Sequence, residues 1–496
     1  MSPNKKSLFV MPDGKNVVFT FILVSSLFLL WGVCNGMIDV MDKHFQDELG
    51  LSKSQSAWVQ FAHYLGYFLM ALPAGWLAIR LGYKGGIITG LLLVAAGGFW
   101  FIPATKINAM VHTGAVSPTT AFVAYLIGVC AIAAGLTFLE TIANPYTTVL
   151  GPTRYAATRI NLAQSCNGIG WIFGPIIGSM FFYTKDAATG RSTGSETLYI
   201  PYVIVGVVVC ILAVVFYFAY IPDVKTEDDY HLDDSAPNVS HSIWTHPHFA
   251  MAVAAQFLYV AAQAGIFSFF INSMTADTKT GFCMVPPIPA AWDQTLATIS
   301  TSLSHFVASL PVWLGWFIKW MPGWLLGWFE TNKSGVLAIS DKGAANLASL
   351  GFVCFLIGRI TGAGLLKKFA AHKVLGLYGV MNVLVCFLIF LNLGWVSVAS
   401  IFLSYFFMSI MFPTIFALGI FGLGARAKKA SAFIVMAIMG GAILPKLMGY
   451  VADQYDMSRG FIVPMACFAF VAFYGYAWPK LAKAESLNGS PAVGGH

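Results

Sequence analysis

Charged residues are scarce in this chain of 496 residues. Asp, Glu, Lys and Arg together make up only 10% of it, whereas 58% of the residues are hydrophobic. Soluble globular proteins carry about 25% charged residues, because their surface faces water. The shortage of charge argues against a soluble enzyme, a nucleic-acid-binding protein and a disordered chain. It indicates a protein whose solvent is the lipid bilayer.

Paired cysteines and catalytic motifs are also missing. The 8 cysteines form no CxxC motif, so they predict neither a disulfide framework nor a metal site. No HExxH, GxSxG or paired-aspartate motif occurs at the depth of the membrane. We therefore expect no enzymatic activity, no bound metal and no cofactor. The first apolar run lacks a small-residue cleavage site and is expected to remain as a transmembrane helix.

Long apolar runs are abundant. A helix needs about 20 mainly apolar residues to cross the hydrocarbon core. The segments that meet this length are 17–43, 55–80, 84–104, 119–147, 158–183, 197–221, 248–274, 344–366, 373–394, 396–423, 430–455 and 460–479. They predict an all-α membrane protein with 12 transmembrane helices in two six-helix bundles, 1–221 and 248–480. An acidic cytoplasmic linker, 222–247, joins the bundles, an insertion, 275–343, interrupts the second, and 481–496 form a cytoplasmic tail.

The distribution of basic residues sets the expected orientation. Lys and Arg are more frequent in the segments on the same side as the two termini, and basic loops stay in the cytoplasm. We predict a multi-pass protein of the plasma (inner) membrane that has both termini in the cytoplasm and functions as a monomer.

Tryptophans recur every three or four residues within the insertion, which places them on one helical face. They are Trp313, Trp316, Trp320, Trp324 and Trp328. Because Trp favours the membrane interface, we expect residues 298–329 to form one or two helices on the outer leaflet. An extra hairpin that crosses the membrane is the alternative.

The two halves of the chain share several spacings. The connection after the second span runs from Gly75 to Lys84, and the connection after the eighth runs from Gly364 to Lys373 with the same spacing. Such a repeat indicates a carrier built from two related bundles. Carriers of this kind rock one half over the other around a substrate site near the midplane.

Ionisable residues inside the spans mark candidate functional positions, because a charge at the bilayer centre costs at least ~2.5–3.5 kcal/mol. Those residues are Asp39, Glu140, Arg359 and Lys446. Asn35 and Asp39 are separated by one helical turn, and so are Glu140 and Asn144, so each pair puts an amide and a carboxylate on one face. We expect Lys446 to extend towards the interface or to pair with a carboxylate.

This mixture of amides, carboxylates and aromatic rings suits a sugar. Asn and Gln both donate to and accept from hydroxyl groups, and a ring can pack against the C–H face of a hexose. The predicted substrate-binding residues are Asn35, Asp39, Gln60, His63, Tyr64, Glu140, Asn144, Gln164, Asn167, Gln256, Tyr259 and Gln263. Asp39 and Glu140 are also predicted to couple transport to protons, because a carboxylic acid in a low-dielectric cavity can gain and lose a proton near neutral pH. The alternative for each amide is a helix-to-helix contact worth about 0.6 kcal/mol.

Several segments resemble a known family. Residues 29–39, 138–145 and 159–167 are similar to the fucose permeases, sugar:cation symporters of the major facilitator superfamily, and residues 255–263 and 407–419 agree in the second half. The resemblance implies the twelve-helix major facilitator fold. It also implies inward transport of a monosaccharide, L-fucose or a related hexose, driven by protons.

The resemblance assigns roles to single positions. The family's coupling carboxylates fall on Asp39 and Glu140, and its amides in the fifth span fall on Gln164 and Asn167. The sequence departs from the fucose permease at Gly36, where that carrier has a second Asn, at His63 and Lys446, and in the 275–343 insertion. These departures leave the identity of the sugar open.

Other functions remain as alternatives. Related carriers transport glucose, galactose or amino sugars, and some of them use Na⁺, which carboxylate and carbonyl oxygens could bind as well as H⁺. A proton-driven drug exporter would favour an apolar cavity, and the amides argue against it. A sugar sensor with a carrier fold that does not transport is the remaining alternative.

Overall fold

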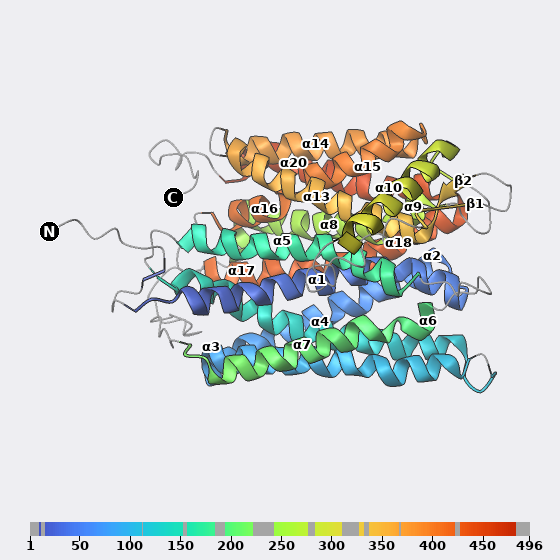
Figure 1. Ribbon diagram of the computed structural model, residues 1–496. Helices are drawn as coiled ribbons and strands as arrows, with labels where there is room; N and C mark the ends of the chain where they lie inside the picture. The colour runs from blue at the N-terminus through green and yellow to red at the C-terminus, as the bar shows by residue number, and fades with distance from the viewer. Residues whose placement is uncertain are drawn as a thin grey trace, which may run out of the picture.

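Long helices run side by side along the whole molecule (Figure 1). The computed structural model describes residues 9–10, 15–111, 113–151, 156–183, 194–221, 243–275, 283–309, 327–331, 337–366, 369–421 and 427–482. The first helix, α1 (Val18–Leu49), defines two ends of the bundle. We call the end at which α1 begins the Val18 end, and the end at which it stops, followed by Gly50, the Gly50 end.

The first half contains six spans. Its elements are α1, α2 (Lys53–Ser56), α3 (Trp58–Ala109), α4 (Pro118–Val149), α5 (Ala156–Phe181), α6 (Gly194–Thr197) and α7 (Tyr199–Phe218). Within this half α3 packs against α4 and α7, and α1 packs against α5. Their contact faces are apolar, so this half forms its own six-helix bundle.

Helix α3 comprises two of the predicted spans. A straight helix of its 52 residues would be about 78 Å long, far more than a membrane core of about 30 Å. The helix breaks at Gly82, whose φ of 68° and ψ of 178° are not helical and suit glycine. Gly66 and Gly97 lie on either side of this break and both contact the same stretch of α4, so that an added Cβ would meet Cys130 O at 2.5 Å and Ile132 N at 2.6 Å respectively. The chain therefore reverses at Gly82, between the predicted spans 55–80 and 84–104.

The second half contains the other six spans, several of them broken. Its elements are η2 (Ile243–Thr245), α8 (Pro247–Ser268), α9 (Phe270–Met274), α10 (Ala290–Ser309), β1 (Phe329–Thr331), β2 (Leu337–Ile339), α13 (Asp341–Leu366), α14 (Ala371–Phe390), α15 (Trp395–Met408), α16 (Met411–Ile420), α17 (Ala427–Met436), η4 (Ala437–Met439), α18 (Gly440–Gln454), α19 (Met457–Gly460) and α20 (Ile462–Leu481). In Figure 1, α14, α15 and α20 lie on the opposite side of the molecule from α3 and α7, with α1, α5 and α8 between them.

The prediction of twelve spans in two bundles is confirmed. Ten helices of the described residues are long and apolar enough to cross a membrane. The first limb of α3 and helix α5 complete the twelve. The linker residues 222–242 and the tail residues 483–496 lie outside the described residues.

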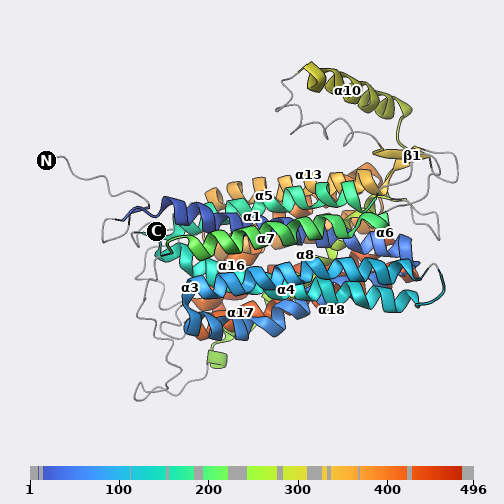
Figure 2. The ribbon, with the colours of Figure 1, turned by 60° about the horizontal axis from the view of Figure 1, so that its bottom comes forward.

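The prediction for the insertion is partly wrong. Helix α10 begins at Ala290 rather than at residue 298, directly after Pro289, and it stands away from the bundle in Figure 2. Phe329, the last residue of the predicted helical segment 298–329, belongs to strand β1, which pairs with β2 in an antiparallel hairpin. At Phe329 the chain therefore pairs with β2 as a strand and does not form a helix. Four of the five tryptophans fall within 310–326, outside the described residues.

The boundary of the eighth span also differs from the prediction. Helix α13 begins at Asp341, three residues before the predicted start at 344. The Ser340 hydroxyl accepts a hydrogen bond from the Gly343 N–H at 3.0 Å, which satisfies a donor in the first helical turn. This polar cap starts the helix before the apolar run begins.

The two bundles meet tightly in the Gly50 half of the molecule. The N–H groups of Lys53 and Ser54, in the first bundle, donate to the two carboxylate oxygens of Asp453 on α18 at 3.0 and 2.8 Å. Nearby, the Gln46 and Asn272 amides exchange hydrogen bonds at 2.6 and 3.3 Å. These contacts join the two bundles at the Gly50 end.

Candidate functional site

Helix α1 carries a buried carboxylate on its inner face. Asp39 is 7% exposed, and its Oδ1 accepts a hydrogen bond of 3.1 Å from the Gln60 side chain on α3. Asn35, one turn towards the Val18 end, is also buried. Asn35 Oδ1 and Asp39 Oδ2 have no hydrogen-bond partner among the described residues. Three of the predicted residues therefore lie together, with polar atoms still available for a ligand.

Aromatic rings of α3 extend this polar face. The His63 ring lies 5.1 Å from the Tyr64 ring and 5.0 Å from the Tyr67 ring, between centroids. The Tyr67 hydroxyl accepts a hydrogen bond from the Trp31 indole on α1. Tyr67 and Trp31 are absent from the predicted set, because an aromatic residue in a membrane helix is more often a packing residue.

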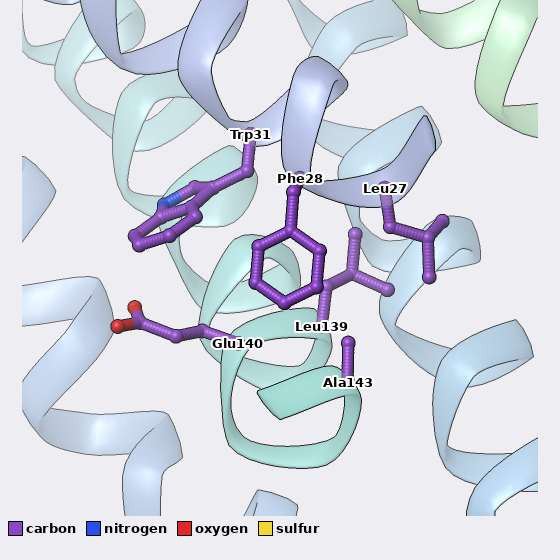
Figure 3. A pocket seen from close by; sticks show the side chains of 6 residues that line it. All are labelled: Leu27, Phe28, Trp31, Leu139, Glu140 and Ala143. Carbon is purple, nitrogen blue, oxygen red and sulfur yellow. The ribbon is translucent and has the colours of Figure 1, made fainter. Parts of the chain in front are cut away.

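Glu140 lies in a small pocket between α1 and α4. The pocket is lined by Leu27, Phe28, Trp31, Leu139, Glu140 and Ala143. In Figure 3 the carboxylate of Glu140 points to the same side as the indole ring of Trp31, and the other labelled side chains are apolar. The pocket therefore combines one acidic group with two aromatic side chains and three aliphatic ones.

The two predicted coupling carboxylates lie at different depths. Trp31, which shares the pocket of Glu140, precedes Asp39 by eight residues of α1. At 1.5 Å per residue this corresponds to about 12 Å along the helix axis. Glu140 thus lies nearer the Val18 end and Asp39 nearer the Gly50 end, so the two carboxylates do not lie side by side.

The two predicted amide side chains of α5 lie in different surroundings. The Asn167 side chain donates to the Phe28 carbonyl on α1 at 3.3 Å, so it joins two helices of the first bundle. Gln164, one turn nearer the Val18 end, is half-buried. Asn144 belongs to α4, but its side chain lies outside the described residues.

Helix α8 presents one amide with unused hydrogen-bonding capacity. Gln256 is fully buried, and neither polar atom of its side chain has a hydrogen-bond partner among the described residues. The Tyr259 hydroxyl donates to the Met408 carbonyl at 2.9 Å, a contact within the second bundle, and Gln263 is half-buried. Because an unsatisfied buried amide costs about 1–3 kcal/mol, Gln256 is the strongest candidate ligand group of this helix.

The two basic residues inside the second bundle contact aromatic rings. The Arg359 guanidinium lies 5.0 Å from the centroid of the Phe355 ring, and its Nε donates to the Ser409 carbonyl at 3.5 Å. That carbonyl has lost its helical donor, because Pro413, four residues later, has no N–H. Lys446 lies 3.9 Å from the centroid of the Trp58 ring. It thus makes a cation–π contact across the two bundles.

Asp42 and Ser268 are absent from the predicted set, but they lie close to Asp39. Asp42 is fully buried, and the Ser268 hydroxyl on α8 donates to its Oδ2. The spacing of three residues between Asp39 and Asp42 already places both on one helical face. The sequence puts Asp42 at the edge of the span 17–43, whereas the structure continues α1 to Leu49 and buries it.

The arrangement can bind polar ligands and protons. Among the described residues, no group of three or more His, Cys, Asp and Glu side chains could hold a metal ion. The polar face of α1, α3 and α8 offers carboxylate oxygens, amides and ring surfaces. This chemistry suits a neutral polyhydroxylated molecule.

Comparisons with known proteins agree with this architecture. The family model described as Major Facilitator Superfamily matches residues 17–331. The chain is 31% identical to the L-fucose-proton symporter of Escherichia coli K12 over 481 residues, which cover 93% of each chain. It is 28% identical to a glucose/galactose transporter of Brucella abortus biovar 1 over 466 residues, 94% of this chain and 95% of that one. The crystal structure of the transporter FucP in the outward conformation matches with a TM-score of 0.60 at 31% identity, covering 93% of this chain and 99% of that chain.

Proposed function

The chain belongs to the Major Facilitator Superfamily, and from this membership we propose that it imports a monosaccharide together with protons by alternating access. Its relatives are transporters, so it is a multi-pass membrane transporter and not an enzyme. The observation that carries the proposal is the buried Asp39 carboxylate, held by Gln60 beside an Asn35 oxygen that has no hydrogen-bond partner among the described residues.

We take L-fucose or a related hexose as the substrate. The similarity to an L-fucose-proton symporter and to a glucose/galactose transporter supports this class. The amides of Asn35 and Gln256 would bind sugar hydroxyls, and the rings of His63 and Tyr64 would pack against the C–H face. Buried polar groups without partners favour a sugar over the apolar amphiphiles of a drug exporter.

The closed Gly50 end supports a direction of access. We propose that the termini are in the cytoplasm of the cell and that the protein acts as a monomer in the plasma (inner) membrane. The Gly50 end then faces outwards, so this conformation is closed to the outside. In the proposed cycle Asp39 takes up a proton from the outer side, and Glu140, nearer the Val18 end, releases a proton to the cytoplasm.

Uptake into proteoliposomes tests the proposal. L-fucose, D-glucose, D-galactose and N-acetylglucosamine are supplied in parallel under an inward pH gradient, with an inward sodium gradient as the second arm. We expect one sugar to accumulate with the pH gradient and to lose its accumulation when a protonophore is added. Accumulation only under the sodium gradient would show that Na⁺, and not H⁺, is the coupling ion. Binding of a sugar without flux in either arm would favour a sensor.

A further inference from the structure

A second carboxylate lies beside Asp39. Asp42 follows Asp39 by three residues on the same face of α1. Asp42 is 0% exposed and Asp39 is 7% exposed. Residues at this spacing have their Cβ atoms roughly 5–6 Å apart. Gln60, which donates to Asp39, also interacts with the carboxyl group of Asp42. The two acidic groups therefore form one buried pair.

Hydrogen bonds satisfy only half of this pair. Asp39 Oδ1 is bound by Gln60 and Asp42 Oδ2 by the Ser268 hydroxyl, whereas Asp39 Oδ2 and Asp42 Oδ1 have no hydrogen-bond partner among the described residues. The adjacent base, Lys43, is engaged elsewhere: its Nζ lies 2.7 Å from Asp47 Oδ1 and 3.7 Å from Asp341 Oδ1.

Other titratable groups also lie around the pair. His44, five residues after Asp39 on α1, packs its ring against that of Phe182, with 5.9 Å between centroids. Just after α5, the Tyr183 hydroxyl donates to the Val40 carbonyl at 2.7 Å. Tyr64 of α3 and Tyr405 of α15 lie close enough to Asp39 to interact with its carboxyl group. His63 of α3 contacts the Tyr64 ring, and Asp341 of α13 lies 3.7 Å from Lys43. On α8 the facing group is Ser268, which is uncharged.

Two carboxylates one turn apart in a low-dielectric interior each disfavour ionisation of the other. We propose that Asp42 is a further coupling residue, which shares a proton with Asp39 and ties that proton to closure of the Gly50 end through Ser268. The Ser268 hydrogen bond crosses from the first bundle to the second, so it exists only when this end is closed. Loss of the proton leaves two buried charges, which favours reopening of the Gly50 end to water.

This coupling rests on the proposed proton symport, and it supplies a reason for the order of steps. Closure of the Gly50 end buries the pair at low cost only when a proton is bound. A carrier that has released its proton therefore returns to the state that is open at the Gly50 end. The proton moves from outer water to the pair and leaves on the other side, and no covalent bond other than that to the proton changes.

The chain offers a matched control one turn away. Gln46 and Asn272 join the same helical layer of α1 to the segment after α8, and both are uncharged. Gln46→Ala weakens closure without altering a titratable group. Asp42→Asn keeps the size of the side chain and an oxygen that accepts from Ser268, but it removes the second acid.

Hydrogen exchange measured by mass spectrometry on the full chain in lipid nanodiscs, without sugar, tests the proposal. Exchange of residues 40–49 and 265–275 is compared at pH 6 and pH 8 after correction for the intrinsic effect of pH. We expect wild-type protein to exchange at least threefold more slowly at pH 6. Asp42→Asn should reduce the ratio of the exchange rate at pH 8 to that at pH 6 at least twofold. Gln46→Ala should speed exchange at both pH values and leave this ratio unchanged.

The outcomes separate this proposal from the proposed function. An unchanged ratio in Asp42→Asn would remove Asp42 from the coupling. Slower exchange at pH 8 with sodium chloride but not with potassium chloride would place Na⁺ between the carboxylates and overturn the shared proton. Because no sugar is present, a failure of sugar uptake leaves the exchange result standing, and the reverse also holds.

Discussion

At the scale of the residue, substitution of Glu140 gives the most direct test of proton coupling. In the proteoliposome assay we expect Glu140→Gln to lose pH-driven accumulation of sugar, because glutamine cannot carry a proton. Sugar exchange between labelled and unlabelled pools should persist, because it needs no net proton movement. Glu196→Gln, an exposed position on α6, is the control and should accumulate sugar as the wild type does. Normal accumulation by Glu140→Gln would remove this residue from coupling.

Gln256 allows binding to be separated from stability. Its buried amide has no protein partner among the described residues, so Gln256→Leu should weaken sugar binding about tenfold by removing a hydrogen bond worth about 1.4 kcal/mol. The melting temperature should stay the same or rise. The comparison is Asn382, whose Oδ1 accepts from Ser404 at 2.9 Å. Asn382→Leu should lower the melting temperature and leave the Kd for sugar unchanged.

At the scale of the element, close approach of α1 and α5 depends on glycine. An added Cβ at Gly170 would lie 2.3 Å from the Leu29 carbonyl oxygen, a backbone atom. Gly170→Ala should therefore push the two helices apart and destabilise the protein by about 1–3 kcal/mol. At Gly364 on α13 an added Cβ would meet nothing within 4 Å, so Gly364→Ala should be neutral or stabilising. Thermal unfolding of the two purified variants measures the difference; equal melting temperatures would contradict it.

Broken helices are the other feature at this scale. Span 10 divides into α15 and α16, where Pro413 leaves the Ser409 carbonyl without its helical donor and Arg359 supplies another. The proline in the sequence indicates a break in the helical hydrogen bonding. The sequence does not indicate that Arg359, 50 positions before Ser409, would donate to the Ser409 carbonyl. Such a contact depends on how α13 packs beside α15.

At the scale of the whole molecule, Asp453 links the bundles at the Gly50 end through the N–H groups of Lys53 and Ser54. Asp453→Ala should shift the protein towards states open at this end, because two inter-bundle hydrogen bonds are lost. Faster hydrogen exchange in residues 51–60 and 447–455 would report this shift. Asp456→Ala is the control, since Asp456 accepts the Arg459 N–H within α19. Equal exchange in both variants would show that Asp453 does not hold this end closed.

The membrane setting, the twelve spans and the division into two six-helix halves were all predictable from the amino-acid sequence. These follow from the scarcity of charge and the lengths of the apolar runs, which depend on the chain alone. The face that carries Asn35 and Asp39 was also predictable, because residues one helical turn apart point the same way. The coupling roles of Asp39 and Glu140 stay predictions, made from the chemistry of carboxylates in a low-dielectric cavity and from the resemblance to a known family.

Which polar groups already have hydrogen-bond partners became known from the packing of the helices and could not be predicted from the sequence. Asn167 is used between α1 and α5 and Tyr259 within the second bundle, whereas Gln256 keeps both amide atoms without a partner among the described residues. Burial of Asp42 against Ser268 is a further case, since the two residues are 226 positions apart. Hydrogen bonds between distant segments depend on how helices pack, and the periodicity of one helix does not indicate which helix packs against it.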